Sequence, residues 1–119
     1  MRNRILVVED ERNLQQLYRM ELEDEGYDVV TAADGASALR RLADEPVDLV
    51  VLDLALPDGS GLECLQQFVE IKRNVKVVIN TAYPLYKRDF HSWAADVFLT
   101  KSSDLTKLKN TIDEMLHSN

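Results

Sequence analysis

The sequence predicts an α/β domain built on a doubly wound sheet of five parallel strands. Five short runs rich in Val, Ile and Leu lie at residues 4–8, 27–32, 49–53, 75–80 and 96–100. Nearly continuous apolar runs of this length are typical of strands that are covered on both faces. Segments with helical apolar spacing follow each run, and short right-handed connections then place helices on both faces of a parallel sheet.

Two helices are expected before the third strand. The first carries four apolar side chains on one face and a glycine beyond its end, where a left-handed cap belongs: Leu14, Leu17, Tyr18, Leu22 and Gly26. The second has a similar stripe, formed by Ala36, Leu39, Leu42 and Ala43. Both helices are expected to bury these faces against the sheet.

Three further helices are expected after the third strand, which brings the number to five. Ser60 and Glu63 have the spacing of a capping box, which predicts the start of the third helix. The fourth and fifth have apolar stripes at Tyr86, Phe90, Trp93 and Ala94, and at Leu105, Leu108, Ile112 and Leu116. Because 119 residues are about the length of one domain, we expect a single domain over residues 1–119.

The composition argues against several classes of function. The formal net charge is −7 and Lys and Arg form no run, which disfavours direct binding to nucleic acid. No apolar run approaches the ~20 residues that cross a bilayer. Cys64 is the only cysteine, which fits a reducing compartment. We therefore expect a cytoplasmic protein without a membrane or nucleic-acid partner.

Polar side chains stand where the expected strands end. Glu9 and Asp10 follow the first strand, Asp53 ends the third, and Thr81 and Lys101 follow the fourth and fifth. In sheets of this kind ligands bind beyond the carboxyl ends of the strands. Neighbouring carboxylates there repel one another unless a cation intervenes. Mg²⁺ is such a cation, since it accepts carboxylates, waters and phosphate oxygens.

These residue types together suit phosphoryl transfer, which depends on positioning and charge neutralisation. A carboxylate such as Asp53 can itself be the nucleophile and form an aspartyl phosphate. Each residue alone has a simpler explanation, because a strand-end Asp is usually a turn or cap residue and a lone Lys is usually a solvated surface charge. The joint occurrence of all of them favours the phosphoryl chemistry.

Five segments occur in a specific order and spacing: ILVVEDE, EGYDVVTAADGASAL, PVDLVVLDLALPDGSGLECL, VVINTAY and DVFLTK. Together they resemble the receiver domain of bacterial two-component response regulators over essentially the whole chain. The resemblance implies a flavodoxin-like receiver fold with strand order 2-1-3-4-5. No output domain is expected in this chain, which is either a stand-alone receiver or a receiver excised from a larger regulator.

The resemblance also implies the metal site. Asp53 is the expected phospho-acceptor and, with Asp10, a direct ligand of Mg²⁺. The backbone carbonyl of Ala55 completes the protein ligands, and Glu9 assists through a water molecule.

Two further roles concern the phosphoryl group and the switch that responds to it. Thr81 and Lys101 are expected to hold the phosphoryl oxygens. Phe98 is the expected switch aromatic, turning inward as Thr81 moves toward the phosphate. Ordinary core or edge packing is the alternative explanation of Phe98.

The implied function is that of a phospho-accepting signalling domain rather than an enzyme acting on other substrates, since it catalyses only its own phosphorylation and dephosphorylation. The donor is a phosphohistidine on a sensor histidine kinase or a phosphotransfer protein. The recipient of the signal is a downstream protein or a missing output domain. The chain is expected to be a monomer or a weak phosphorylation-dependent dimer.

Several positions depart from the family pattern. Glu9 replaces the usual Asp, and Ser102 replaces the usual Pro, whose preceding bond is typically cis. A cis bond without proline costs about 3 kcal/mol, so the sequence leaves the isomer of this bond open. Pro84 stands where the fourth helix should begin, so that helix is expected to be short or displaced.

The residues two beyond Asp53 and Thr81 are Ala55 and Tyr83, neither of which can act as a general base, which predicts a long-lived phosphoryl group. If the fold is kept but the phosphorylation-dependent switch is lost, the chain is instead a phosphorylation-independent pseudo-receiver that serves as a protein-interaction module. A phosphatase with an aspartyl intermediate is disfavoured, because Ala55 stands where its general acid would be.

Overall fold

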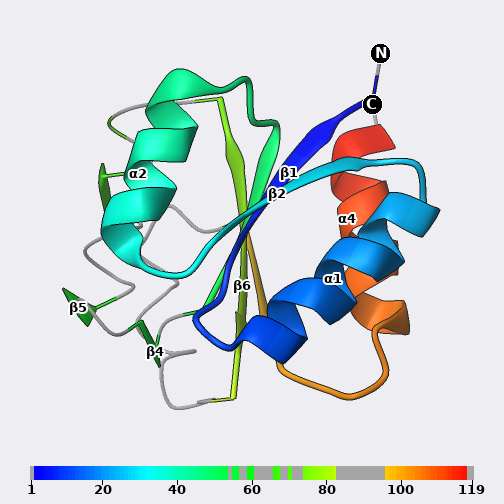
Figure 1. The fold of residues 1–119 in the computed structure, drawn as a ribbon. Coiled ribbons are helices and arrows are strands. Elements are labelled where there is room, and N and C mark those ends of the chain that lie inside the picture. Colours follow the sequence, from blue (N-terminus) through cyan, green and yellow to red (C-terminus); the bar gives the residue numbers. More distant parts are fainter. Residues whose placement is uncertain are drawn as a thin grey trace.

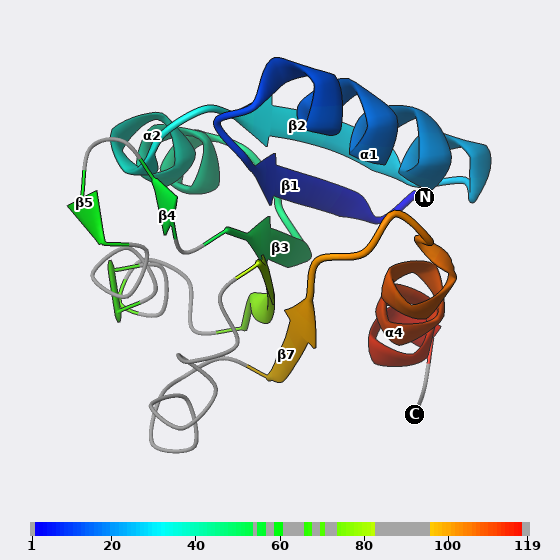
Figure 2. The same cartoon turned by 90° about the horizontal axis from the view of Figure 1, so that it is seen from below.

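A five-stranded parallel sheet forms the centre of the fold, as the sequence predicts (Figure 1). The computed structural model describes residues 2–53, 55–56, 59–60, 66–67, 70, 74–82 and 96–117. The strands of the sheet are β1 (Arg4–Val8), β2 (Asp28–Ala32), β3 (Leu49–Leu52), β6 (Lys76–Thr81) and β7 (Val97–Thr100). Their order is β2-β1-β3-β6-β7, which confirms the expected order 2-1-3-4-5 (Figure 2).

Helices cover both faces of this sheet. Helices α1 (Arg12–Asp24) and α4 (Thr106–His117) lie on one face, and α2 (Gly35–Asp44) lies on the other (Figure 1). Alternate residues of each strand therefore enter different cores. In β1, Leu6 and Val8 pack with α2, whereas Ile5 and Val7 pack with α1 and α4. The nearly continuous apolar runs are thus explained by burial on both faces.

The helix ends follow local sequence signals. Gly26, just after α1, has a φ of 96°, a left-handed conformation that side chains rarely adopt. At the start of α2, the Asp34 carboxylate accepts a hydrogen bond from the amide of Ser37 at 2.7 Å, which satisfies one unpaired donor of the first turn. Among the helices described here, none is both long and apolar enough to cross a membrane.

The expected inner face of α1 is narrower than the sequence pattern suggests. Tyr18 and Leu22 are buried and Leu14 packs partly against the core, but Leu17 is 39% exposed. The prediction that Leu17 shares the buried face is therefore wrong, and it is also wrong for Ala36 and Ala43 of α2, which are exposed. Leu17 precedes Tyr18 by one residue, or about 100° around the helix, and this rotation carries it to the edge of the contact with the sheet.

The segment after β3 contains a small antiparallel ribbon that the sequence does not reveal. Strand β4 (Ala55–Leu56) pairs with β5 (Gly59–Ser60). Ser60, expected to cap the third helix, therefore lies in β5, and its expected partner Glu63 lies outside the described residues. Residues 66, 67 and 70 are helical, within the range expected for that helix. The expected fourth helix also lies outside the described residues.

Candidate functional site

The register of the sheet brings the strand-end residues to one edge. Val8 of β1 lies opposite both Ala32 of β2 and Leu52 of β3. The hydrogen-bonded ladder continues one step further, since the amide of Asp53 donates to the carbonyl of Val8 at 3.1 Å. Glu9 and Asp53 therefore leave neighbouring strands at the same level, as the parallel topology predicts.

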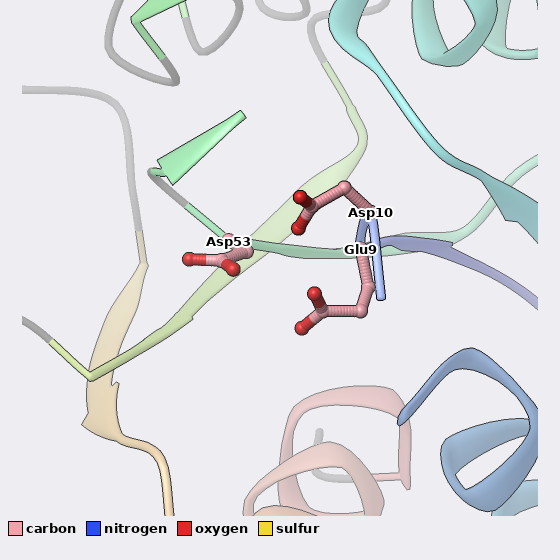
Figure 3. A group of neighbouring side chains, drawn as sticks. All are labelled: Glu9, Asp10 and Asp53. Carbon is pink, nitrogen blue, oxygen red and sulfur yellow. The ribbon is translucent and has the colours of Figure 1, made fainter. Parts of the chain in front are cut away.

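Three carboxylates meet beyond these strand ends. Figure 3 shows Glu9 and Asp10 after β1 and Asp53 after β3, and oxygen atoms of the three side chains lie within 4.8 Å of one another. Glu9 is only 2% exposed and Asp53 only 5%, whereas Asp10 is exposed. Two of the acids are thus withdrawn from water, and the third opens the cluster to solvent.

Lys101 supplies the positive charge that this cluster requires. Its Nζ lies 2.8 Å from Oδ2 of Asp53 and 2.6 Å from Oε1 of Glu9. The other Glu9 oxygen, Oε2, accepts a hydrogen bond from the amide of Glu11 at 3.1 Å. The peptide bond between Lys101 and Ser102 is trans. Lysine therefore reaches both carboxylates without the cis bond that is usual in the family.

The electrostatics of this group follow from burial and from the lysine. Burial raises the pKa of Glu9, while the hydrogen bond and charge of Lys101 oppose that rise and the charge of Asp53 adds to it. Burial disfavours the ammonium form of Lys101, but hydrogen bonds and attraction from Asp53 and Glu9 outweigh it and raise the pKa of Lys101. The lysine is accordingly a fixed cation at neutral pH.

Thr81 is the last residue of β6 and is fully buried. Its carbonyl accepts a hydrogen bond from the amide of Lys101 at 2.8 Å, just beyond the pairing of Thr81 with Thr100. The two residues expected to hold phosphoryl oxygens are therefore adjacent across the β6–β7 ladder. Their backbones are fixed relative to each other by this hydrogen bond.

Of the remaining predicted site residues, the structure describes Ala55 and Phe98 only by their positions in strands. Ala55 lies in β4, two residues after Asp53. Phe98 lies in β7 opposite Ile79, and its side chain is outside the described part of the chain. Tyr83 and Pro84 are also outside it.

One buried polar contact near the site was missed by the sequence analysis. The side-chain amide of Asn80 donates to the hydroxyl of Tyr18 at 3.1 Å, and both residues are buried. The apolar spacing of the first helix predicts packing for Tyr18 but no hydrogen bond. The sequence does contain one indication of this contact. Asn80 is a polar residue within the apolar β6 sequence, directly before Thr81.

The donor set fits a hard divalent cation. Carboxylate oxygens are the ligands that Mg²⁺ prefers, and it is bound through one or two carboxylates together with waters and phosphate oxygens. Asp10 and Asp53 offer two such carboxylates from adjacent strands. Glu9 already has its two oxygens beside Lys101 and the Glu11 amide, which suits a supporting position more than a direct ligand.

Comparisons with known proteins point to one family. The family model described as the response regulator receiver domain matches residues 5–113. The response regulator ArlR of Staphylococcus saprophyticus is 34% identical over 114 residues, which cover 95% of this chain and 52% of that protein. The chain thus spans about half the length of this relative. Sporulation initiation phosphotransferase F of Bacillus subtilis is 37% identical over 83 residues, covering 70% of this chain and 67% of that one.

Solved structures give the same result. The response regulator TrrA of Thermotoga maritima, determined in complex with Mg²⁺-BeF, is 40% identical and superimposes with a TM-score of 0.90 over 95% of this chain and 98% of TrrA. A second structure contains TrrA in complex with the histidine kinase ThkA, and its TrrA chain gives a TM-score of 0.88 at 40% identity over 96% of this chain and 98% of that one.

Proposed function

Because the chain belongs to the family of response regulator receiver domains, we propose that it receives a phosphoryl group on Asp53 from a phosphohistidine of a partner protein. The observation that carries this proposal is the setting of Asp53. Its carboxylate is nearly buried at the end of a central strand, 2.8 Å from Lys101 and close to two further acids. A carboxylate in such a position can act as a nucleophile.

In the proposed reaction, an oxygen of Asp53 attacks the phosphorus as the phosphorus–nitrogen bond of the donor breaks. The electron pair of that bond returns to the imidazole, and Asp53 becomes an acyl phosphate. Bound Mg²⁺ would neutralise charge on the carboxylates and the phosphoryl oxygens. Asp10, Asp53 and the carbonyl of Ala55 are the proposed ligands of the metal, with Glu9 acting through water.

Lys101 and Thr81 are proposed to hold the product. The Lys101 ammonium, now shared by Glu9 and Asp53, would pair with a phosphoryl oxygen, and the Thr81 hydroxyl would donate to another. Movement of Thr81 toward the phosphate, with inward rotation of Phe98, would change the partner-binding surface.

The partners follow from the same proposal. A histidine kinase is a suitable donor, since the similar protein TrrA has been crystallised with one, and a phosphotransfer protein is the other. The signal passes to a downstream protein or to an output domain beyond this chain, and the phosphorylated chain is a monomer or a weak dimer. A cytoplasmic location and a signalling rather than an enzymatic role belong to the same proposal.

Intact-mass measurement after incubation with Mg²⁺ and either acetyl phosphate or phosphoramidate tests the proposal. We expect a gain of one phosphoryl mass that is absent without Mg²⁺ and absent in Asp53→Asn. Asp34→Asn is the matched control, because the Asp34 carboxylate caps α2 and is not one of the three acids of the cluster, and this variant should be phosphorylated normally. No gain with any donor or metal would favour the pseudo-receiver module instead.

A further inference from the structure

The hydrogen bond between Tyr18 and Asn80 joins α1 to the end of β6. Both residues are buried, and Tyr18 packs in the apolar cluster that α1 and α4 form on the sheet, together with Val78 and Leu105. Asn80 follows Val78 by two residues and points to the same face. A side-chain amide is thus placed beside the apolar side chains of this layer.

Stability alone is a weak reason for such a pair. Burying an amide or a hydroxyl is costly unless each finds a hydrogen-bond partner. Replacing both partners by apolar groups of the same shape is often neutral or stabilising. An apolar pair would not fix the relative orientation of its two side chains. A buried hydrogen bond does, because it holds the two groups in one arrangement.

The place of the pair in the fold makes this orientation relevant to the site. Asn80 directly precedes Thr81 and lies opposite Leu99 in the β6–β7 ladder. It also lines a cavity of about 150 Å³ with Ser102 and Asp104, in the segment that follows Lys101. The partner of Asn80, Tyr18, is also close to the site: burial raises the pKa of its hydroxyl, and the charges of Lys101, Glu9 and Asp53 also affect that pKa. The pair thus lies next to the strand end that carries Thr81, within range of the charges of the cluster.

We propose that Tyr18 and Asn80 are positioning residues, whose hydrogen bond holds the end of β6 against α1 and so aligns Thr81 and Lys101 for phosphoryl transfer to Asp53. This inference rests on the proposed function. Neither side chain contacts the reacting atoms in this scheme. Both act through the backbone that carries Thr81 and, across the ladder, Lys101.

The test uses Tyr18→Phe, Asn80→Leu and the double variant, with phosphoramidate as donor and saturating Mg²⁺. We expect each of the three to lower the maximal phosphorylation rate about fivefold, the value of one neutral hydrogen bond. The Kd for Mg²⁺ should stay unchanged, because the acids proposed to bind it are untouched. The double variant should regain thermal stability relative to Asn80→Leu without regaining rate.

Tyr27→Phe is the matched control. Tyr27 is likewise buried and its hydroxyl donates to Asp113, but it precedes β2 at the opposite end of the sheet from the acids. Its loss should lower the melting temperature and leave the phosphorylation rate unchanged.

Two results would overturn the inference: a rate in the double variant that recovers along with its stability, or an equal loss of rate in Tyr27→Phe. Either would reduce the pair to a structural contact. A wild-type chain that takes up no phosphoryl group would overturn the proposed function itself.

Discussion

Replacing Lys101 with methionine would leave Glu9 and Asp53 without their shared counter-charge. Their side chains are 3% and 6% exposed, and that of Lys101 is 19% exposed. Removing one partner of a buried ion pair typically costs about 3–5 kcal/mol, because a charge is left in a poorly solvated site. Since the lysine is itself partly solvated and Asp10 opens the cluster to water, we expect a loss near the lower end, about 3 kcal/mol at pH 7 without metal.

The loss should shrink at low pH. Burial already raises the pKa of Glu9, and removing Lys101 removes an attraction that opposes this rise. The folded variant therefore binds the Glu9 proton more tightly than the unfolded chain does. The stability that protonated Glu9 contributes to the variant is fully present below the unfolded pKa of about 4.3. This contribution is lost as the pH rises through the pKa of Glu9 in the folded variant. Mg²⁺ should also restore stability, by about 2.7 kcal/mol at a hundred times its Kd.

Urea unfolding followed by circular dichroism at pH 5 and pH 7, with EDTA or with Mg²⁺, measures these effects. Lys109→Met is the control, since Lys109 also forms an ion pair of 2.8 Å, with Glu21, but its side chain and that of Glu21 are 25% and 36% exposed. That variant should lose far less stability, and Mg²⁺ should stabilise it no more than it stabilises the wild type, because its acidic cluster is intact. Equal losses in the two variants, or a Lys101→Met loss independent of pH and metal, would refute the reasoning.

Three further predictions concern the metal, the lifetime of the product and the opposite end of the fold. Asp10→Asn should weaken Mg²⁺ binding by at least about tenfold in calorimetry, a loss typical even of groups that only support a ligand; unchanged affinity would exclude Asp10 as a ligand. Because neither Ala55 nor Tyr83 can act as a general base, the acyl phosphate should decay more slowly than in fast chemotaxis-type receivers, as followed by intact mass over time. Burial and Asp113 raise the pKa of Tyr27, so its contribution to stability is present below about pH 10 and is lost as the pH rises through the folded value. Urea unfolding from about pH 9 to about pH 11 should therefore show a shallower alkaline loss in Tyr27→Phe, and parallel curves would contradict this.

The sheet could be predicted because burial on both faces leaves a direct mark on the sequence. Strand β1 coincides with the predicted run at residues 4–8, and β3 is apolar at all four of its positions. The edge of a helix face leaves a weaker mark, so the apolar spacing predicts a buried Leu17 although this side chain is exposed. The two-residue strands β4 and β5 are too short to show any periodicity.

Part of the candidate site could likewise be predicted from the sequence, and part of it could not. Topology alone places Glu9, Asp53 and Lys101 at one edge, because the carboxyl ends of parallel strands align. The bridge from Lys101 to Glu9 depends on side-chain length and rotamer, which spacing does not encode. The pair of Tyr18 and Asn80 could not be predicted either, since a tyrosine in an apolar stripe shows its packing but not the direction of its hydroxyl.

The most direct measurement is to locate the phosphoryl group in the wild-type chain. After phosphorylation with phosphoramidate and Mg²⁺, borohydride reduction converts an aspartyl phosphate to homoserine, which tandem mass spectrometry of the digested chain can assign to one position. We predict homoserine at position 53 and at no other aspartate. Homoserine at Asp10 or elsewhere with Asp53 intact, or no conversion at all, would contradict the assignment of Asp53 as the phospho-acceptor.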